Sequence, residues 1–194
     1  MDEIGLRAAR SLSASIEEEV GEMLKSKILE RNKHEARGIA YNLLGLMPEF
    51  VMRYLLLRKL YSSEENRSLK YYPEFALDRS DQIDLVLYDC DIAHAIEIKR
   101  WQARDAAKAI INRDVPKLRR FCEEYPDSHA HEIVVTMNHS SRSKKEYTCA
   151  FQQEFSDHLT LKQTYVHAFS NHLTLCVYYA VPVNEPSLGT SDSS

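Results

Sequence analysis

Glycine is scarce in this chain, with five residues in 194, and neither glycine pattern that cradles nucleotide phosphates occurs, G-x-x-x-x-G-K-[ST] or G-x-G-x-x-G. ATP hydrolysis and dinucleotide chemistry therefore have no support. The local signatures of serine and cysteine nucleophiles are also missing. The four cysteines are widely spaced without a C-x-x-C pair, which argues against a zinc ribbon or a disulfide framework and favours reduced thiols.

Long apolar runs are absent too. No stretch approaches the roughly 20 apolar residues of a membrane span, and the N-terminus lacks the apolar segment of a signal peptide. We therefore expect a cytoplasmic protein with no membrane partner. With 44% hydrophobic residues in 194, the chain can bury a core of one domain. The formal charge of −4 excludes a general polycation but not a local basic surface for nucleic acid.

The first third of the chain has the periodicity of helices. Residues 13–60 are predicted to be helical, with a capping box at Ser15-x-x-Glu18 and a break in the polar stretch 30–35. Pro48 suits the first turn of a further helix, which is predicted to end near Tyr61. The residues predicted to be buried in that helix are Phe50, Val51, Tyr54, Leu55, Leu57 and Leu60.

Short apolar runs separated by turn residues follow, and they predict strands. The next helical pattern, at 104–125, contains Asp114 as a candidate cap of a helix with Pro116 in its first turn. Segments 144–156 and 160–168 have a weaker pattern. The predicted strands are 71–77, 82–88, 92–98, 132–137 and 173–183. This order predicts an α/β fold, a central mixed sheet flanked by helices. We expect an N-terminal helical extension at 1–44, a core at 45–183 and a disordered tail at 184–194.

Two acids and a lysine lie within the apolar strands in the middle of the chain. Glu97 and Lys99 are two positions apart, so a strand sends both to one face. A hairpin turning at Asp89-Cys90-Asp91 would set Asp84 beside them. Charges in apolar runs are costly unless they are paired or bound to a metal. The group predicts a site for Mg²⁺ or Mn²⁺ and a phosphodiester, with the Ile98 carbonyl as a further ligand and Lys99 as a charged group that positions water and phosphate.

The pattern Asp84 … Glu97-Ile98-Lys99 resembles the PD-(D/E)XK nuclease superfamily, which has the restriction-endonuclease-like fold. The resemblance covers roughly residues 45–138. It implies metal-dependent cleavage of DNA, less often of RNA. Glu74 resembles an acid that many members carry on the preceding strand, and Glu49 resembles a glutamate that many members project from a helix into the site. Asp114-Val115-Pro116-Lys117-Leu118 is similar to the start of the helix after the E-x-K strand in some members.

Each of these residues also has a structural interpretation. Asp84, Glu97 and Lys99 would form a cross-strand ion pair on a solvated hairpin. Glu74 would be an acid at a strand edge, and Glu49 would favour the positive end of its helix.

Basic residues follow the E-x-K strand. Residues 99–120 hold eight basic and two acidic residues, a local charge of +6, which predicts a phosphate-binding flank or, alternatively, a solvated helix face. Trp101 would stack on a base or cap the core. The residues predicted to bind nucleic acid are Arg100, Trp101, Arg104, Lys108, Lys117, Arg142 and Lys144.

Other classes of function remain open at this point. One is a non-catalytic nucleic-acid-binding or assembly module of the same fold. Another is a helical interaction protein that dimerises through 13–60, although the polar stretch 30–35 makes a continuous coiled coil a poor match. The N-terminal helices are also a possible homodimer interface of a nuclease. His129 and His131 have metal-chelating spacing, but solvated loop histidines explain them better.

Overall fold

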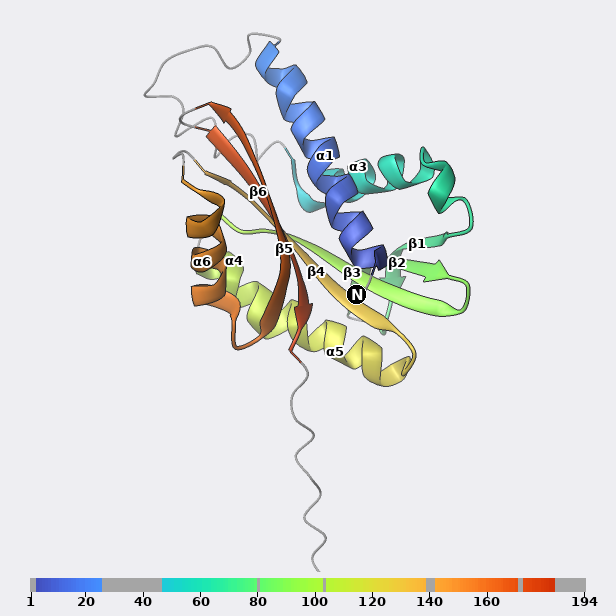
Figure 1. Ribbon diagram of the computed structural model, residues 1–194. Helices are drawn as coiled ribbons and strands as arrows, with labels where there is room; N and C mark the ends of the chain where they lie inside the picture. Colours follow the sequence, from blue (N-terminus) through green and yellow to red (C-terminus); the bar gives the residue numbers. More distant parts are fainter. Residues whose placement is uncertain are drawn as a thin grey trace, which may run out of the picture.

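A computed structural model describes residues 3–25, 47–79, 81–102, 104–138, 142–170 and 173–183. Its centre is a six-stranded mixed sheet in the order β1-β2-β3-β4-β6-β5, in which β3 and β4 are parallel and all other neighbours are antiparallel (Figure 1). The strands are β1 (Lys70–Ala76), β2 (Gln82–Asp89), β3 (Ile92–Arg100), β4 (His129–Asn138), β5 (Leu159–Ser170) and β6 (Leu173–Pro182).

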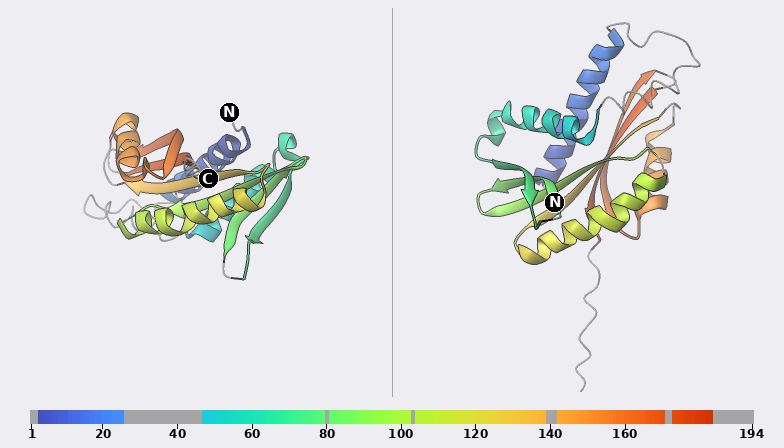
Figure 2. Two further views of the ribbon diagram at one scale, coloured as in Figure 1. Left: turned by 90° about the horizontal axis from the view of Figure 1, so that it is seen from below. Right: turned by 180° about the vertical axis from the view of Figure 1, so that it is seen from behind.

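Helices cover both faces of the sheet (Figure 2). One face packs against α1 (Glu3–Lys25) and α3 (Glu49–Tyr61). A short 3-10 turn, η1 (Glu64–Asn66), connects α3 to β1. The other face packs against α4 (Arg104–Ala109), the π-helical turn η2 (Ile110–Asp114), α5 (Val115–Glu124) and α6 (Lys144–Phe155). The predicted α/β class and the mixed sheet flanked by helices are confirmed.

The parallel pair β3–β4 explains where α5 lies. Parallel neighbours require a crossover connection, usually a helix that packs on one face of the sheet. Here α4, η2 and α5 form that crossover, and Leu118 and Phe121 of α5 pack on Val86 and Ala95. A central strand that is covered on both faces has a sequence of nearly continuous apolar residues. Any polar side chain of β3 that faces α5 is therefore buried between a sheet and a helix.

The start of α1 differs from the prediction. The helix begins at Glu3 and not near Ser15, which is buried in its interior, where its hydroxyl donates to the Leu55 carbonyl at 3.5 Å. Because Ser15 bonds across to α3, the Ser15–Glu18 spacing is not a capping box in this structure. Residues 26–46 lie outside the described residues, and so do the predicted break at 30–35, the predicted boundary at residue 44 and the predicted tail at 184–194.

Asp114 occupies the N-cap position of α5, as predicted, but its side chain makes no capping hydrogen bond. Its backbone is helical, and it lies inside a helical run that starts at Arg104 and continues through η2 into α5. Pro116 does lie in the first turn of α5 as predicted. A π turn widens the helix locally and is common at functional sites. Here it ends at Asp114, whose side chain is fully buried.

The predicted burial of α3 is only half right. Leu55 and Leu60 are buried, and the helix ends at Tyr61 as predicted, but Phe50 and Tyr54 are more than half exposed. The sequence of α3 is apolar on nearly all sides, so the period alone does not tell which side faces the core.

No described helix is long and apolar enough to cross a membrane.

Candidate functional site

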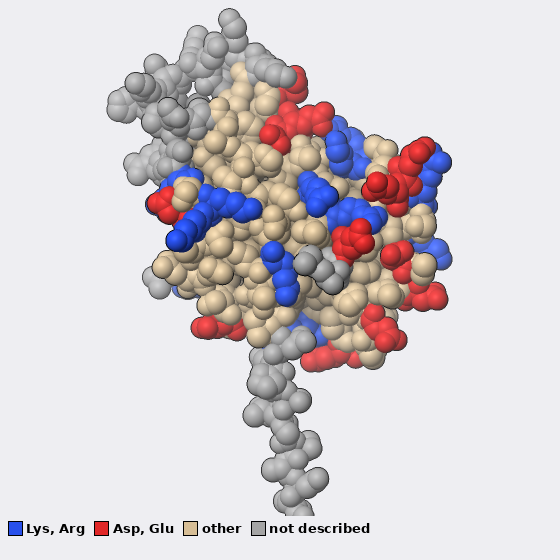
Figure 3. Space-filling model, viewed as in Figure 1, with Lys and Arg blue, Asp and Glu red and all other residues tan. Residues whose placement is uncertain are grey.

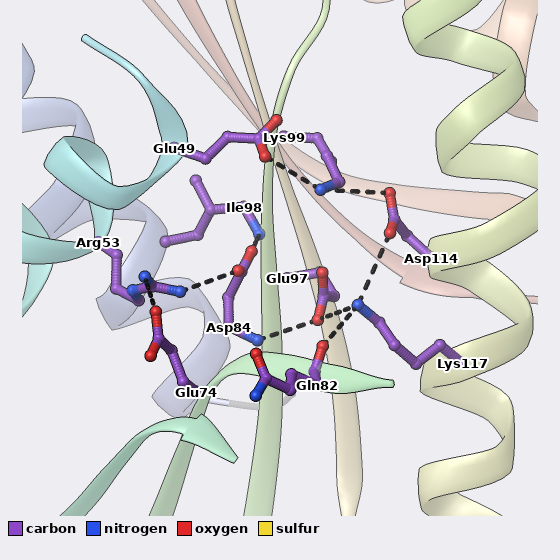
Figure 4. A network of polar contacts seen from close by, with 10 residues as sticks. All are labelled: Glu49, Arg53, Glu74, Gln82, Asp84, Glu97, Ile98, Lys99, Asp114 and Lys117. Atoms are coloured by element: carbon purple, nitrogen blue, oxygen red, sulfur yellow. Dashed lines mark hydrogen bonds and ion pairs between the residues drawn. The ribbon is translucent and has the colours of Figure 1, made fainter. Parts of the chain in front are cut away.

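The site lies where β2 and β3 separate (Figure 4). The ladder between these strands runs from the Asp89–Ile92 pair to the Leu85–Ile96 pair. Beyond that pair, side chains replace backbone bonding. The Ile98 amide donates to Oδ2 of Asp84 at 2.9 Å, and the Asp84 amide donates to Oε1 of Glu97 at 3.0 Å. The predicted hairpin is thus confirmed, and it brings Asp84 next to Glu97.

Glu97 and Lys99 both point from β3 toward α5, as their spacing predicts. Nζ of Lys117 on α5 lies 2.7 Å from Oε1 of Glu97 and donates to the Gln82 carbonyl at 2.8 Å. The second oxygen of Glu97, Oε2, is buried and has no hydrogen-bond partner among the described residues. Burial, then the charge of Asp84, raises the pKa of Glu97 to about 8, although Lys117 opposes the rise.

Lys99 is held between two helices. Its Nζ donates to Oε2 of Glu49 at 3.1 Å and lies 3.9 Å from Oδ2 of Asp114. Burial alone would lower the pKa of Lys99, but the charges of Asp114, Glu49 and Asp84 outweigh it and raise the pKa above its usual value. This favours a charged Lys99 that positions other groups over a neutral base.

Arg53 of α3 closes the other side of the site. It donates to Oδ1 of Asp84 at 3.1 Å and to Oε1 of Glu74 at 2.7 Å. Glu74 is exposed and has a backbone φ of 53° on β1, a left-handed conformation that non-glycine residues rarely adopt. The two second-tier metal candidates therefore each contact a cation: Glu74 contacts Arg53, and Glu49 contacts Lys99.

A fully buried acid, Glu132, adds to the site from β4. It is the parallel-register partner of Glu97, so the two side chains leave neighbouring strands on the same face. Within the described part of the chain, neither carboxyl oxygen of Glu132 has a hydrogen-bond partner. Burial first, and then the charges of Asp114 and Glu97, raise the pKa of Glu132 well above its ordinary value.

Asp114 lies across from Glu132 on the crossover. Its two oxygens are buried and lie 3.7 Å from Lys117 and 3.9 Å from Lys99, so it forms long ion pairs with both lysines. Burial raises the pKa of Asp114 to about 6 against the pull of Lys99 and Lys117. Six carboxyl groups thus lie around three cations, so the site holds more acidic than basic side chains. The carboxyl groups belong to Glu49, Glu74, Asp84, Glu97, Asp114 and Glu132, and the cations are Arg53, Lys99 and Lys117.

Sequence patterns missed part of this group. Glu132 is the first residue of a run rich in β-branched residues, and Asp84 likewise stands at the start of an apolar run. This shared position is the sequence feature that could have pointed to Glu132. Asp114 and Lys117 are three apart, which places both on one face of a helix. Arg53 carried no signal beyond its place on an apolar helix.

The residues predicted to bind nucleic acid are divided by the fold. Lys117 is buried in the site, and Trp101 packs its ring edge-on against Phe155, with ring centroids 5.1 Å apart, as a core residue does. Arg100 is half-buried and its amide donates to Glu49 at 3.5 Å. Lys108, Arg142 and Lys144 are exposed, and the side chain of Arg104 lies outside the described residues. On the face seen in Figure 3, basic and acidic side chains are interspersed without a continuous patch of either sign among the described residues.

The donor atoms of the site determine which metal ions it could hold. Over residues 3–25, 47–79, 81–102, 104–138, 142–170 and 173–183, no group of three or more His, Cys, Asp or Glu side chains is arranged to hold a metal ion. Mg²⁺ is commonly held by one or two carboxylates together with several waters, so a pair of acids is sufficient. Asp84 and Glu97 are such a pair, and the partnerless Oε2 of Glu97 fits a cation.

Comparison of the chain with family models, with curated proteins and with solved structures gave no match. The function of the chain therefore has to be argued from its own residues.

Proposed function

We propose that the chain is a metal-dependent nuclease that hydrolyses DNA phosphodiester bonds, with the restriction-endonuclease-like core that its D…E-x-K pattern resembles. The observation that carries the proposal is the convergence of Asp84, Glu97 and Lys99 where β2 leaves β3. Buried charges are costly unless they are paired or bound to a metal, and buried groups with shifted pKa values such as Glu97 cluster at functional sites.

Asp84 and Glu97 would hold Mg²⁺ or Mn²⁺, with the carbonyl of Ile98 as a further oxygen. A bound divalent ion polarises phosphoryl oxygens and lowers the pKa of a water. The other residues orient the reactants. Lys99, charged and fixed by Glu49, supplies a cation for a phosphate oxygen and a donor for the attacking water. Arg53 holds Asp84 in place from α3, so that one of its oxygens stays toward Ile98.

Asp84→Asn and Lys99→Met test the proposal. Each should lower cleavage of plasmid or oligonucleotide DNA in Mg²⁺ or Mn²⁺ by roughly 100-fold or more, because each removes charge next to the reacting phosphate. Asp91→Asn and Lys162→Met are matched controls, because both side chains are exposed, Asp91 in the turn at the opposite end of the hairpin from Asp84 and Lys162 on β5. Cleavage that survives both site substitutions would reject these roles.

A second candidate is a non-catalytic nucleic-acid-binding or assembly module of the same fold. Its support is Lys117, whose ammonium lies 2.7 Å from Glu97 and so already supplies a cation to the acid. A calorimetric titration with Mn²⁺ distinguishes the two candidates. A nuclease should bind the ion in a manner that Asp84→Asn abolishes, whereas a module should bind DNA equally with and without metal.

A further inference from the structure

The outer side of α3 carries an exposed aromatic stripe, which we define as Phe50, Tyr54 and Tyr61. These rings are 63%, 60% and 66% exposed, unusually high for large apolar side chains on a helix that also contributes to the core. At 100° per residue, the three rings and the half-buried Leu57 fall within an arc of about 60° on one side of the helix. Figure 1 shows α3 at the periphery of the molecule, with α1 and β1 beside it.

The stripe begins beside the candidate site. Glu49 directly precedes Phe50 and accepts a hydrogen bond from Lys99. Arg53 directly precedes Tyr54 and donates a hydrogen bond to Asp84. One helix therefore presents two polar residues to the site and, about a quarter-turn around its axis, the rings to solvent. A strand whose phosphate lay at Lys99 would therefore lie near Phe50, because Glu49 contacts Lys99 and directly precedes Phe50.

One ring of the stripe packs against a neighbouring ring. The Tyr61 ring stacks on Tyr71 of β1 in a tilted arrangement, with centroids 4.4 Å apart. Successive rings are separated by about 6 Å and about 10 Å along the helix axis. A row of separated rings on one helix suits the flat faces of unstacked bases, and base–aromatic stacking is tolerant of sequence because every base has such a face.

We propose that the aromatic stripe stacks the bases of single-stranded nucleic acid, and that the substrate of the site is therefore an unpaired strand; the substrate class rests on the proposed nuclease function. Duplex DNA hides its base faces by internal stacking, so exposed rings select against it. The 4-3-4 spacing of Phe50, Tyr54, Leu57 and Tyr61 is also that of a coiled-coil seam between two copies of the chain. Such seams are built from aliphatic side chains over several heptads, whereas α3 has 13 residues and three of the four positions are rings.

Binding without metal tests the inference separately from cleavage. A fluorescent single-stranded oligonucleotide of about 16 nucleotides is titrated with protein in EDTA and followed by anisotropy, beside the same sequence as a duplex. Single strands should bind at least about tenfold more tightly than duplex, and Phe50→Ala and Tyr54→Ala should each weaken binding by roughly fivefold to a hundredfold. Phe50→Tyr and Tyr54→Phe should bind single strands as tightly as the wild type, because both keep a ring.

One control variant completes the experiment. Tyr125→Ala removes a ring that is 37% exposed at the end of α5, on the opposite face of the sheet, and should leave binding unchanged. Failure of the nuclease proposal would be distinguishable, because it would appear as absent cleavage by the wild type in Mg²⁺ or Mn²⁺ with ring-dependent single-strand binding in EDTA intact. Equal affinity for duplex, or unchanged binding in both alanine variants, overturns the inference. So does a dimer in sedimentation that Phe50→Ala with Tyr54→Ala dissociates.

Discussion

Glu132 is the residue whose environment departs furthest from what a carboxylate requires. It is fully buried, beside Glu97 and near Asp114, and the structure gives its oxygens no partner among the described residues. Burial without a partner favours the neutral form of a carboxyl group, which explains why the pKa of Glu132 is raised. Its neutral form can donate one proton, unlike the ionised form.

The raised pKa of Glu132 makes stability depend on pH. When the pKa of an acid is higher in the folded than in the unfolded state, stability falls as pH rises above the unfolded value. Glu132→Gln removes this loss, because the amide has nearly the same shape and does not ionise. We expect the variant to gain stability relative to the wild type from about pH 5 upward, by roughly 1–3 kcal/mol at pH 9. Urea unfolding at pH 5, 7 and 9 measures it.

Glu65→Gln is the matched control for Glu132→Gln, since Glu65 is exposed in η1. Its difference from the wild type should not change with pH. A Glu132→Gln variant that loses stability at pH 9 would show that the ionised carboxylate is stabilised in the folded protein, contrary to its burial.

α1 lies close to the sheet at Gly5. A Cβ atom there would meet the Tyr179 hydroxyl and would lie 2.5 Å from Nδ1 of His131. Those two groups are buried and contact one another at 3.2 Å, so neither can retreat into solvent. The absence of a side chain at Gly5 is therefore what allows the first turns of α1 to rest on β4 and β6.

The two glycines of α1 should respond oppositely to alanine. Gly5→Ala forces the helix away from the sheet, and the free energy of unfolding should fall by roughly 1–3 kcal/mol. Gly21→Ala has space, since no described atom lies within 4 Å of the added Cβ, and should raise it by roughly 0.5–1 kcal/mol through helix propensity. Urea unfolding of both variants measures the pair. A Gly5→Ala protein as stable as Gly21→Ala would show that α1 does not dock on the sheet at Gly5.

At the same scale, the elements that sequence patterns predict well are apolar runs bounded by turn residues or a proline. Strands at 82–88 and 92–98 and the helix ending at Tyr61 needed only local apolar patterning and turn residues, and they lie where predicted. The predicted start of α1 was wrong because Ser15 and Glu18 have the spacing of a capping box, whereas Ser15 lies inside the helix and contacts α3. A short motif cannot tell a helix end from an interhelical contact.

The site was predictable as far as its residues lie on one hairpin. Asp84, Glu97 and Lys99 are joined by a turn, so strand alternation alone brings them together. Glu132 and Asp114 reach the same place only through the parallel crossover, which depends on which strands become neighbours. Pairing between distant segments is not written in local periodicity, and for this reason those two acids were missed.

For the molecule as a whole, the nuclease proposal couples metal binding, proton release and stability. The pKa of Glu97 is raised to about 8, so below that pH an ion bound by this residue must displace a proton. The affinity for Mn²⁺ should then rise about tenfold per pH unit between pH 6 and 8 if one proton is released. Tighter binding appears as stability of the whole fold, because an ion that binds only the folded protein opposes unfolding.

Thermal unfolding with and without Mn²⁺ measures this coupling directly. At a fixed, saturating concentration of the ion, its stabilisation should grow by about 1.4 kcal/mol per pH unit from pH 6 toward 8 and then level off as Glu97 becomes ionised in the free protein. Asp84→Asn should remove most of the effect, whereas Asp91→Asn, exposed in the β2–β3 turn, should keep it. Stabilisation that is the same at pH 6 and 8 would mean that the ion does not bind Glu97. Stabilisation that persists in Asp84→Asn would place the ion elsewhere in the protein, and the two acids of the hairpin would then hold Lys117 and Arg53 as structural cations instead.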